Sequence, residues 1–276
     1  MGDSVSKSDP YPNDTLRWVA AEVRFPPSPA LTESVPADLQ NHLQSGFPIL
    51  EEEVQLNVSV VGGGIPQQVV RRRFLTRDRL RAVTVSREGV TLEATQYDGW
   101  TDFRGTFVRS LEALARCALP AGVLRVGLRY IDEIRIPEAP GNLAGWSGWV
   151  DDRLIAPFSL YDPNRLTNAT VVLQYGQQGG FTTVFRAAPF ARGRTVLPQG
   201  ALRVPVDTPD DAYFLLDADA SWSDADRKVP EFDPGQVSGI LDQLHESCLA
   251  LFEASITDRL RDDVLRRDRN GGVVAS

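Results

Sequence analysis

The densest group of side chains capable of chemistry is a run of arginines between positions 71 and 81. Six guanidinium groups fall within these eleven residues, at Arg71, Arg72, Arg73, Arg77, Arg79 and Arg81. On a strand Arg71 and Arg73 share one face, and a hairpin brings Arg79 or Arg81 opposite them. Guanidinium groups bind carboxylates and phosphates through paired hydrogen bonds, so the run predicts a site for an anionic partner such as an acidic peptide. The alternative is a solvated sheet face that pairs with Glu51-Glu52-Glu53.

A second candidate group is aromatic. Trp146 and Trp149 stand beside Gly145 and Gly148, with Tyr130 earlier in the chain. Tryptophans in such a setting line a groove or anchor a partner, because they offer a large apolar surface with a polar edge. The alternative is that they close the bottom of a hydrophobic core.

The usual catalytic and cofactor signatures are missing from the sequence. His42 and His245 are the two histidines, and neither has metal-ligand spacing to enough partners, although Cys248 follows His245 by three positions. There is no Gly-x-Ser-x-Gly, Gly-x-Gly-x-x-Gly or Walker loop. We therefore expect no catalytic residue, no metal and no cofactor.

Two aspartates near the C-terminal third form a further candidate. On a strand Asp217 and Asp219 point to the same face, as cation sites require. A calcium loop is excluded because Trp222 stands where that loop needs glycine. The pattern leaves three possibilities: a water-facing pair, a cation site, or a docking surface for basic groups.

Charge and composition restrict the class of protein. The 276 residues carry a formal net charge of −8, which argues against nucleic acid and against an anionic membrane surface as partners. Only Lys7 and Lys228 are lysines, so 27 of the 29 basic residues are arginines, as a GC-rich bacterial genome produces. No apolar run is long enough to cross a bilayer. Two helical cysteines, Cys117 and Cys248, fit buried thiols in a reducing cytoplasm.

The elements that must position these residues fall into two halves. Residues 1–14 are predicted to be a flexible tail and residues 15–120 the first half, with a strand at 16–25 and a helix at 35–44. Four strands follow at 54–60, 69–75, 81–86 and 90–95, and then a helix capped by Asp102.

The second half covers residues 121–267, followed by a tail at 268–276. It has a strand at 124–136, a helix at 146–155, and strands at 169–175, 181–187, 201–206 and 213–218. A long amphipathic helix begins at Asp233-Pro234. The segment Gly176–Gly180 is predicted to be a hairpin turn.

Two similar octapeptides suggest that the halves are copies. Residues 19–26 read VAAEVRFP and residues 130–137 read YIDEIRIP, so Glu22 and Glu133 are 111 positions apart. We predict an α+β fold of two strand–helix–four-strand–helix halves with antiparallel sheets, related by internal duplication. A helix-grip variant would enclose an apolar cavity, whereas a ferredoxin-like variant would not. The repeated Glu and Arg then form a structural pair, and Asp132 is the residue that duplication does not explain.

Three segments also carry a resemblance to a known family. These are FLTRDRLRAVTVSREGVTLEATQYDGWTDF at 74–103, GLRYIDEIRIP at 127–137 and HESCLALFEASITDRLR at 245–261. Together they resemble a sporadically distributed family of uncharacterised bacterial proteins, with LRYIDEI at its core. The family has no settled activity, so the resemblance supplies no catalytic residues to carry over, and it suggests an association with peptide natural-product clusters.

We therefore predict a non-catalytic peptide- or protein-binding accessory protein of the cytoplasm, which binds a precursor peptide or another acidic partner and forms a homodimer. The alternatives are a small-molecule binder or enzyme with a helix-grip cavity, and an interaction module of a defence or toxin system. The predicted binding residues are Arg71, Arg73, Arg79, Arg81, Tyr130, Asp132, Trp146 and Trp149.

Overall fold

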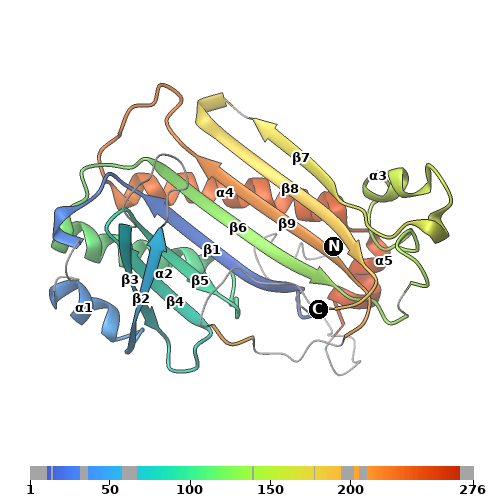
Figure 1. Cartoon of the computed structure of the whole chain (residues 1–276), viewed down its shortest axis with the longest axis horizontal. Helices are drawn as coiled ribbons and strands as arrows, with labels where there is room; N and C mark the ends of the chain where they lie inside the picture. Colours follow the sequence, from blue (N-terminus) through green and yellow to red (C-terminus); the bar gives the residue numbers. More distant parts are fainter. Residues whose placement is uncertain are drawn as a thin grey trace, which may run out of the picture.

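One antiparallel sheet runs through the whole protein (Figure 1). The computed structural model describes residues 11–13, 15–31, 37–57, 67–138, 140–176, 178–193, 202–204 and 210–267. In this part of the chain the sheet has nine strands: β1 (Leu16–Arg24), β2 (Ile49–Asn57), β3 (Gln67–Leu75), β4 (Arg81–Ser86), β5 (Gly89–Ala94), β6 (Arg125–Ile134), β7 (Val171–Gly176), β8 (Phe181–Phe190) and β9 (Tyr213–Trp222). Their order is β2-β3-β4-β5-β1-β6-β9-β8-β7.

The helices are α1 (Ala37–Gln44), α2 (Trp100–Ala118), α3 (Asp152–Ile155), α4 (Pro234–Ser255) and α5 (Asp258–Leu260). Short 3₁₀ helices span Pro29–Leu31, Ala156–Ser159, Pro163–Arg165 and Gln178–Gly180, and a π-helix spans Arg261–Leu265. The predicted α+β class with antiparallel strands is confirmed.

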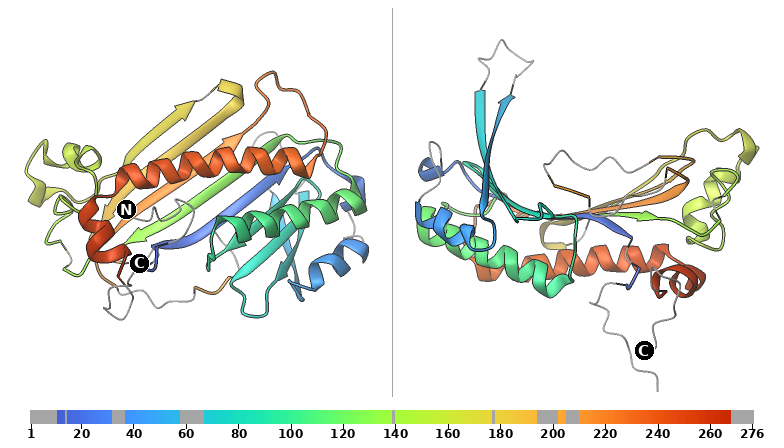
Figure 2. Two further views of the ribbon diagram at one scale, coloured as in Figure 1. Left: turned by 180° about the vertical axis from the view of Figure 1, so that it is seen from behind. Right: turned by 90° about the horizontal axis from the view of Figure 1, so that it is seen from below.

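The two long helices lie on the same face of the sheet (Figure 2, left). Alternate strand residues such as Val19, Ala21 and Val23 point to this face and are almost fully buried. The helices meet them with apolar stripes at helical spacing: Phe103, Phe107, Leu111 and Leu114 on α2, and Val237, Leu241, Leu244 and Cys248 on α4. All these residues belong to one hydrophobic core that runs across both predicted halves.

The two halves meet at the β1–β6 pair in the middle of the sheet. In each half the first strand pairs with the last, β1 with β5 and β6 with β9, and the remaining strands follow outward. The register places Val19 opposite Tyr130 and Glu22 opposite Gly127. The halves therefore share one sheet and one core.

Several predicted boundaries differ from the structure. β2 begins at Ile49, five positions before the predicted strand. Gly99 occupies the N-cap of α2, so Asp102 lies in its first turn and does not cap it. The predicted helix at 146–155 shortens to α3, since the preceding residues form turns that include Gly148 at a φ of 79°. Residues 202–204 of the strand predicted at 201–206 are not in a strand. The glycines at 62–64, for which the sequence predicts a hairpin turn, lie outside the described residues.

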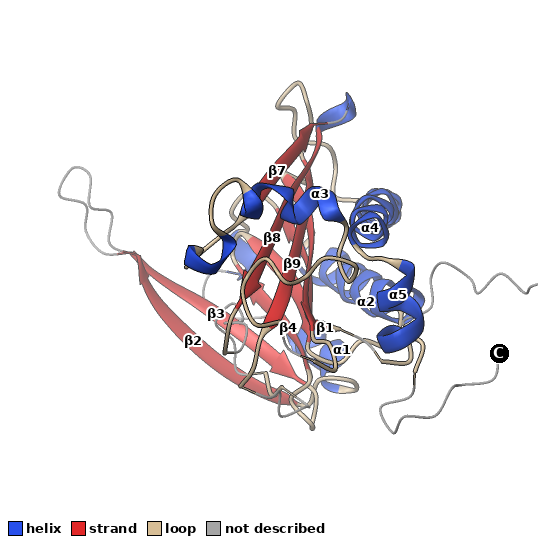
Figure 3. Cartoon of the chain, turned by 90° about the vertical axis from the view of Figure 1, so that its right-hand side faces the viewer, coloured by secondary structure: helices blue, strands red, loops and turns tan. Residues whose placement is uncertain are grey.

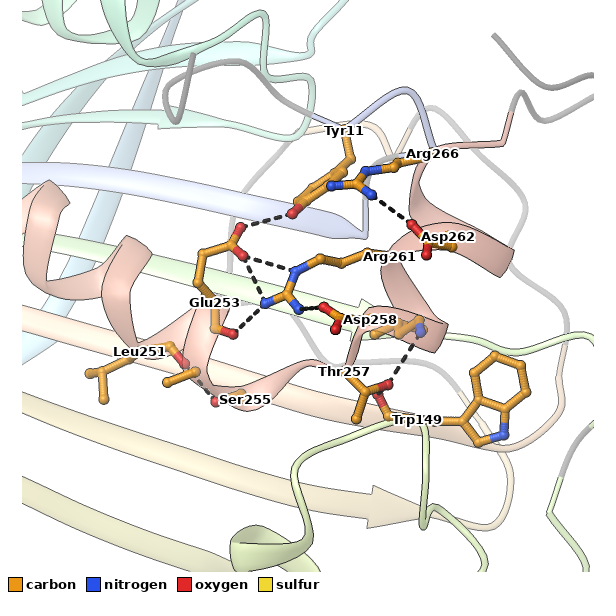
Figure 4. Close-up of polar contacts among 12 residues, drawn as sticks. Tyr11, Trp149, Leu251, Glu253, Ser255, Thr257, Asp258, Arg261, Asp262 and Arg266 are labelled. Carbon is orange, nitrogen blue, oxygen red and sulfur yellow. Dashed lines mark hydrogen bonds and ion pairs between the residues drawn. The ribbon is translucent and has the colours of Figure 1, made fainter. Parts of the chain in front are cut away.

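The first described residues pack against the C-terminal end of the fold (Figure 4). The hydroxyl of Tyr11 donates to the Glu253 carboxylate at 2.9 Å, and the backbone N–H of Asn13 donates to the Leu265 carbonyl at 3.0 Å. Arg261 binds the same carboxylate at 3.0 Å. Residues 11–13 therefore belong to the folded body, in contrast to the flexible tail predicted for residues 1–14.

Candidate functional site

The face of the sheet opposite the helices carries an open groove of about 510 Å³. The β2–β3 hairpin rises steeply from this face and forms a wall beside it (Figures 2 and 3). Residues 202–204 lie over the same face, where Leu202 packs against Trp18, Ala20 and Ile131. The groove is lined by five arginines and three carboxylates, namely Arg24, Arg71, Arg73, Arg125, Arg129, Glu22, Glu93 and Asp219.

Strand alternation explains why these residues meet. Arg125, Gly127 and Arg129 occupy alternate positions of β6 and face away from the helices. Gly127 leaves room for its neighbour, because a Cβ atom at this position would lie 2.6 Å from Nη1 of Arg125. The guanidinium of Arg125 therefore lies flat on the sheet.

Ion pairs connect the arginines to the carboxylates of this face. Arg125 lies 2.8 Å from Glu22 and 3.7 Å from Asp219. Arg129 binds Asp217 through two hydrogen bonds of 2.7 and 2.9 Å, and Arg186 adds a third of 3.1 Å. Asp217 and Asp219 thus share a face as predicted, with guanidinium groups as their neighbours. Among the described residues no group of three or more metal-ligating side chains forms a site.

Burial and pairing raise the pKa values of two groups at this end of the groove, Asp219 and Arg129. Burial raises the pKa of Asp219, although Arg125 and Arg129 oppose the shift. A hydrogen bond to Asp217 raises the pKa of Arg129, which stays a cation. Arg129 is therefore a fixed positive charge, which Asp217 partly offsets.

The other end of the groove contains two buried polar atoms for which the described residues supply no partner. Arg73 is 8% exposed and its Nη2 donates to Glu93, yet its Nε is buried and has no hydrogen-bond partner among the described residues. The same holds for Oγ1 of Thr84, which stands directly opposite Arg73 on β4. Thr84 faces Thr91, and Thr91 faces Glu22, so a polar row crosses the sheet.

Of the four predicted arginines, only Arg71 and Arg73 line the groove. Arg79 pairs with Glu51 at 2.6 Å, and Arg81 pairs with Asp98 and Asp102 beside the start of α2. Arg72 binds Glu52 at 3.1 Å, as the alternative with a glutamate-paired face predicted. Arg71 and Arg73 thus share a face, whereas Arg79 and Arg81 lie beyond the end of β3 and pair with other carboxylates, so the structure does not bring the four arginines together.

The remaining predicted residues lie away from the groove. Tyr130 and Asp132 point to the helix face, where Asp132 accepts a hydrogen bond from Thr15 at 3.0 Å. Trp146 is 1% exposed and packs edge-on against Phe214. Trp149 lies under the guanidinium of Arg259, 3.8 Å from the ring centre. These four side chains belong to the core or its margin, so the eight predicted residues do not form one site.

Sequence reasoning missed three arginines and both threonines of the groove, namely Arg24, Arg125, Arg129, Thr84 and Thr91. The available signal was the alternation in β6, where Arg125 and Arg129 flank Gly127 at spacings of two. The second signal was the pair Thr84 and Thr91, each of which lies between two buried apolar residues of its strand.

Comparisons with protein-family models, curated proteins and solved structures each found no match. The resemblance to an uncharacterised bacterial family stays a prediction. In the described part of the chain, no helix has the length and apolar character needed to cross a membrane.

Proposed function

We propose that the protein is a non-catalytic binding protein of the bacterial cytoplasm, which holds an acidic peptide or protein segment in the groove. The observation that carries this proposal is a local reversal of charge. The chain has a net charge of −8, yet the groove gathers five arginines against three carboxylates. Such a surface attracts carboxylates and orients them by hydrogen bonds.

The character of the groove favours a peptide over a small molecule. Small-molecule sites are mostly apolar and enclose most of the ligand, whereas this groove is open and lined by charged and small polar side chains. On the helix face, where a helix-grip cavity would lie, Leu241, Leu244 and Cys248 of α4 are at most 2% exposed. This close packing favours the groove over a cavity below α4.

We also infer that the two halves arose by duplication. With an offset of 111, Val19 and Tyr130 are equivalent residues, and they also stand opposite each other in the β1–β6 pair. If β1 and β6 are copies related by a pseudo-twofold axis that passes between them, a residue of β1 at that axis must stand opposite its own equivalent in β6. The repeated ion pairs, Glu22–Arg24 at 3.0 Å and Glu133–Arg135 at 2.8 Å, support the same relation.

The identity of the partner stays open to experiment. A precursor peptide of a natural-product pathway is one acidic ligand of the proposed kind, and a component of a defence system is another. The homodimer predicted from the sequence is likewise a proposal, and light scattering of the purified protein tests it.

Binding of a defined acidic peptide tests the proposal. The probe is a fluorescein-labelled, C-terminally amidated peptide of alternating glycine and glutamate, titrated with protein and followed by fluorescence anisotropy. The Arg24→Gln/Arg71→Gln double variant removes two exposed charges of the groove and should weaken binding about tenfold. High salt should weaken binding to the wild type as well.

The matched control is Arg153→Gln/Arg266→Gln, which removes two exposed arginine charges outside the groove. This control should bind the peptide like the wild type. Equal losses in both double variants, or no binding by the wild type, would refute the proposal. A lysine peptide of the same length should not bind.

A further inference from the structure

The floor of the groove contains a preformed place for one carboxylate. Arg73 on β3, Thr84 on β4 and Thr91 on β5 stand side by side across the sheet, on the face away from the helices. Glu93 holds one side of the Arg73 guanidinium through Nη2. The orientation of this guanidinium is therefore fixed before any ligand arrives.

Within the described part of the chain, two donors at this place lack an acceptor. Nε of Arg73 and Oγ1 of Thr84 are both buried, and neither has a hydrogen-bond partner among the described residues. A buried donor without a partner is costly, so proteins retain one mainly where a ligand, ion or water satisfies it. Both residues line the groove, and rotation about the Cα–Cβ bond of Thr84 turns its hydroxyl toward a ligand while Glu93 holds the Arg73 guanidinium in place.

We propose that Arg73 and Thr84, with Thr91 beside them, form the anchor subsite of the groove and bind one carboxylate of the acidic segment. The two oxygens of a carboxylate match the two unpaired donors, N–H and O–H. Glu93 and Glu22 lie close by, and they disfavour a doubly charged phosphate more than a singly charged carboxylate. This inference rests on the proposed function and names the group that the groove recognises.

Thr84→Val is the decisive substitution because it removes the hydroxyl and keeps the shape. If Oγ1 has no partner in the free protein, valine should raise the melting temperature by about 2–4 °C. The same substitution should weaken binding of the glycine–glutamate peptide about tenfold. A residue with a purely structural role would not show this gain in stability together with a loss of affinity.

Thr182→Val is the matched control, since Thr182 lies on the same sheet face but outside the groove. It should leave the affinity unchanged. Single glutamate-to-glutamine exchanges along the peptide should reveal one position at which the exchange weakens binding to the wild type but not to Thr84→Val. A parallel arm compares amidated and free-acid peptides, and it distinguishes a side-chain carboxylate from a C-terminal one.

The outcomes separate this inference from the proposed function. If Arg24→Gln/Arg71→Gln weakens binding and Thr84→Val does not, the groove binds the peptide but the anchor subsite is wrong. A lower melting temperature for Thr84→Val would show that the hydroxyl has a partner in the free protein and would also overturn the subsite. No peptide binding by the wild type would overturn both.

Discussion

At the scale of single residues, His245 shows how burial controls a titratable group. Its ring stacks on Trp100 with the ring centres 4.2 Å apart, and its Nδ1 lies 3.0 Å from the Tyr130 hydroxyl. Burial lowers the pKa of His245 to about 4. Burial also raises the pKa of Tyr130, so the tyrosine keeps its proton beside a neutral imidazole.

This environment predicts a stability that depends on pH. Below pH 6.5 the unfolded chain takes up a proton that folded His245 binds only near pH 4. The free energy of unfolding should therefore fall as the pH drops from about 6.5 to about 4, by up to roughly 3 kcal/mol. Urea unfolding at several pH values measures this loss.

His245→Asn keeps a hydrogen-bond partner for Tyr130 but cannot titrate. The fall in its free energy of unfolding between about pH 6.5 and about pH 4 should therefore be smaller than that of the wild type by the contribution of His245. His42→Asn serves as the control because His42 is exposed on α1. If the pH dependence of His245→Asn equals that of the wild type, the buried imidazole is not its source.

At the scale of elements, the β7–β8 turn depends on two glycines with different constraints. Gly179 and Gly180 have φ angles of 79° and 88°, which favour glycine. A Cβ atom at position 180 would also lie 1.8 Å from the Ser223 carbonyl oxygen, whereas one at 179 would meet only the Phe181 ring at 3.8 Å. The turn is therefore packed against the end of β9 on one side only.

The pair predicts unequal costs for the same substitution. Gly179→Ala should lower the free energy of unfolding by about 1 kcal/mol, from the left-handed conformation alone. Gly180→Ala should cost roughly 3 kcal/mol, because the backbone near Ser223 must also move. Chemical denaturation of both variants measures the difference, and equal costs would show that the contact with Ser223 is loose.

The sequence predicted the positions of the strands better than it predicted which face of the sheet each side chain occupies. The alternation in β4 and the Gly-rich turn before β8 are local signals. The strand predicted at 81–86 appears with those bounds, and the strand predicted at 181–187 appears and extends to residue 190. Which face the helices cover is not a local signal. Tyr130 therefore suggested a site and Arg129 did not, whereas the helices bury the tyrosine and leave the arginine in the groove.

At the scale of the whole molecule, the two halves are joined by more than the β1–β6 pair. The Asp242 carboxylate on α4 accepts hydrogen bonds from Trp100 at 2.8 Å and from Arg104 at 2.5 Å, both on α2. Tyr11 ties the start of the chain to Glu253. One core continues through both halves, so we expect them to unfold as one cooperative unit.

The reactivity of Cys248, which lies in the second half, tests whether the two halves unfold together. Its thiol is buried and burial raises its pKa, so it should react with an alkylating agent only after unfolding. Leu111→Ala removes a fully buried side chain of α2 in the first half and should cost roughly 2–5 kcal/mol. If the two halves unfold as one unit, the substitution destabilises both, so Cys248 becomes reactive at a lower urea concentration.

Glu112→Ala, at an exposed position of the same helix, is the control and should leave the urea concentration at which Cys248 reacts unchanged. If Leu111→Ala also leaves Cys248 protected as in the wild type, the halves unfold separately and the shared core does not couple them.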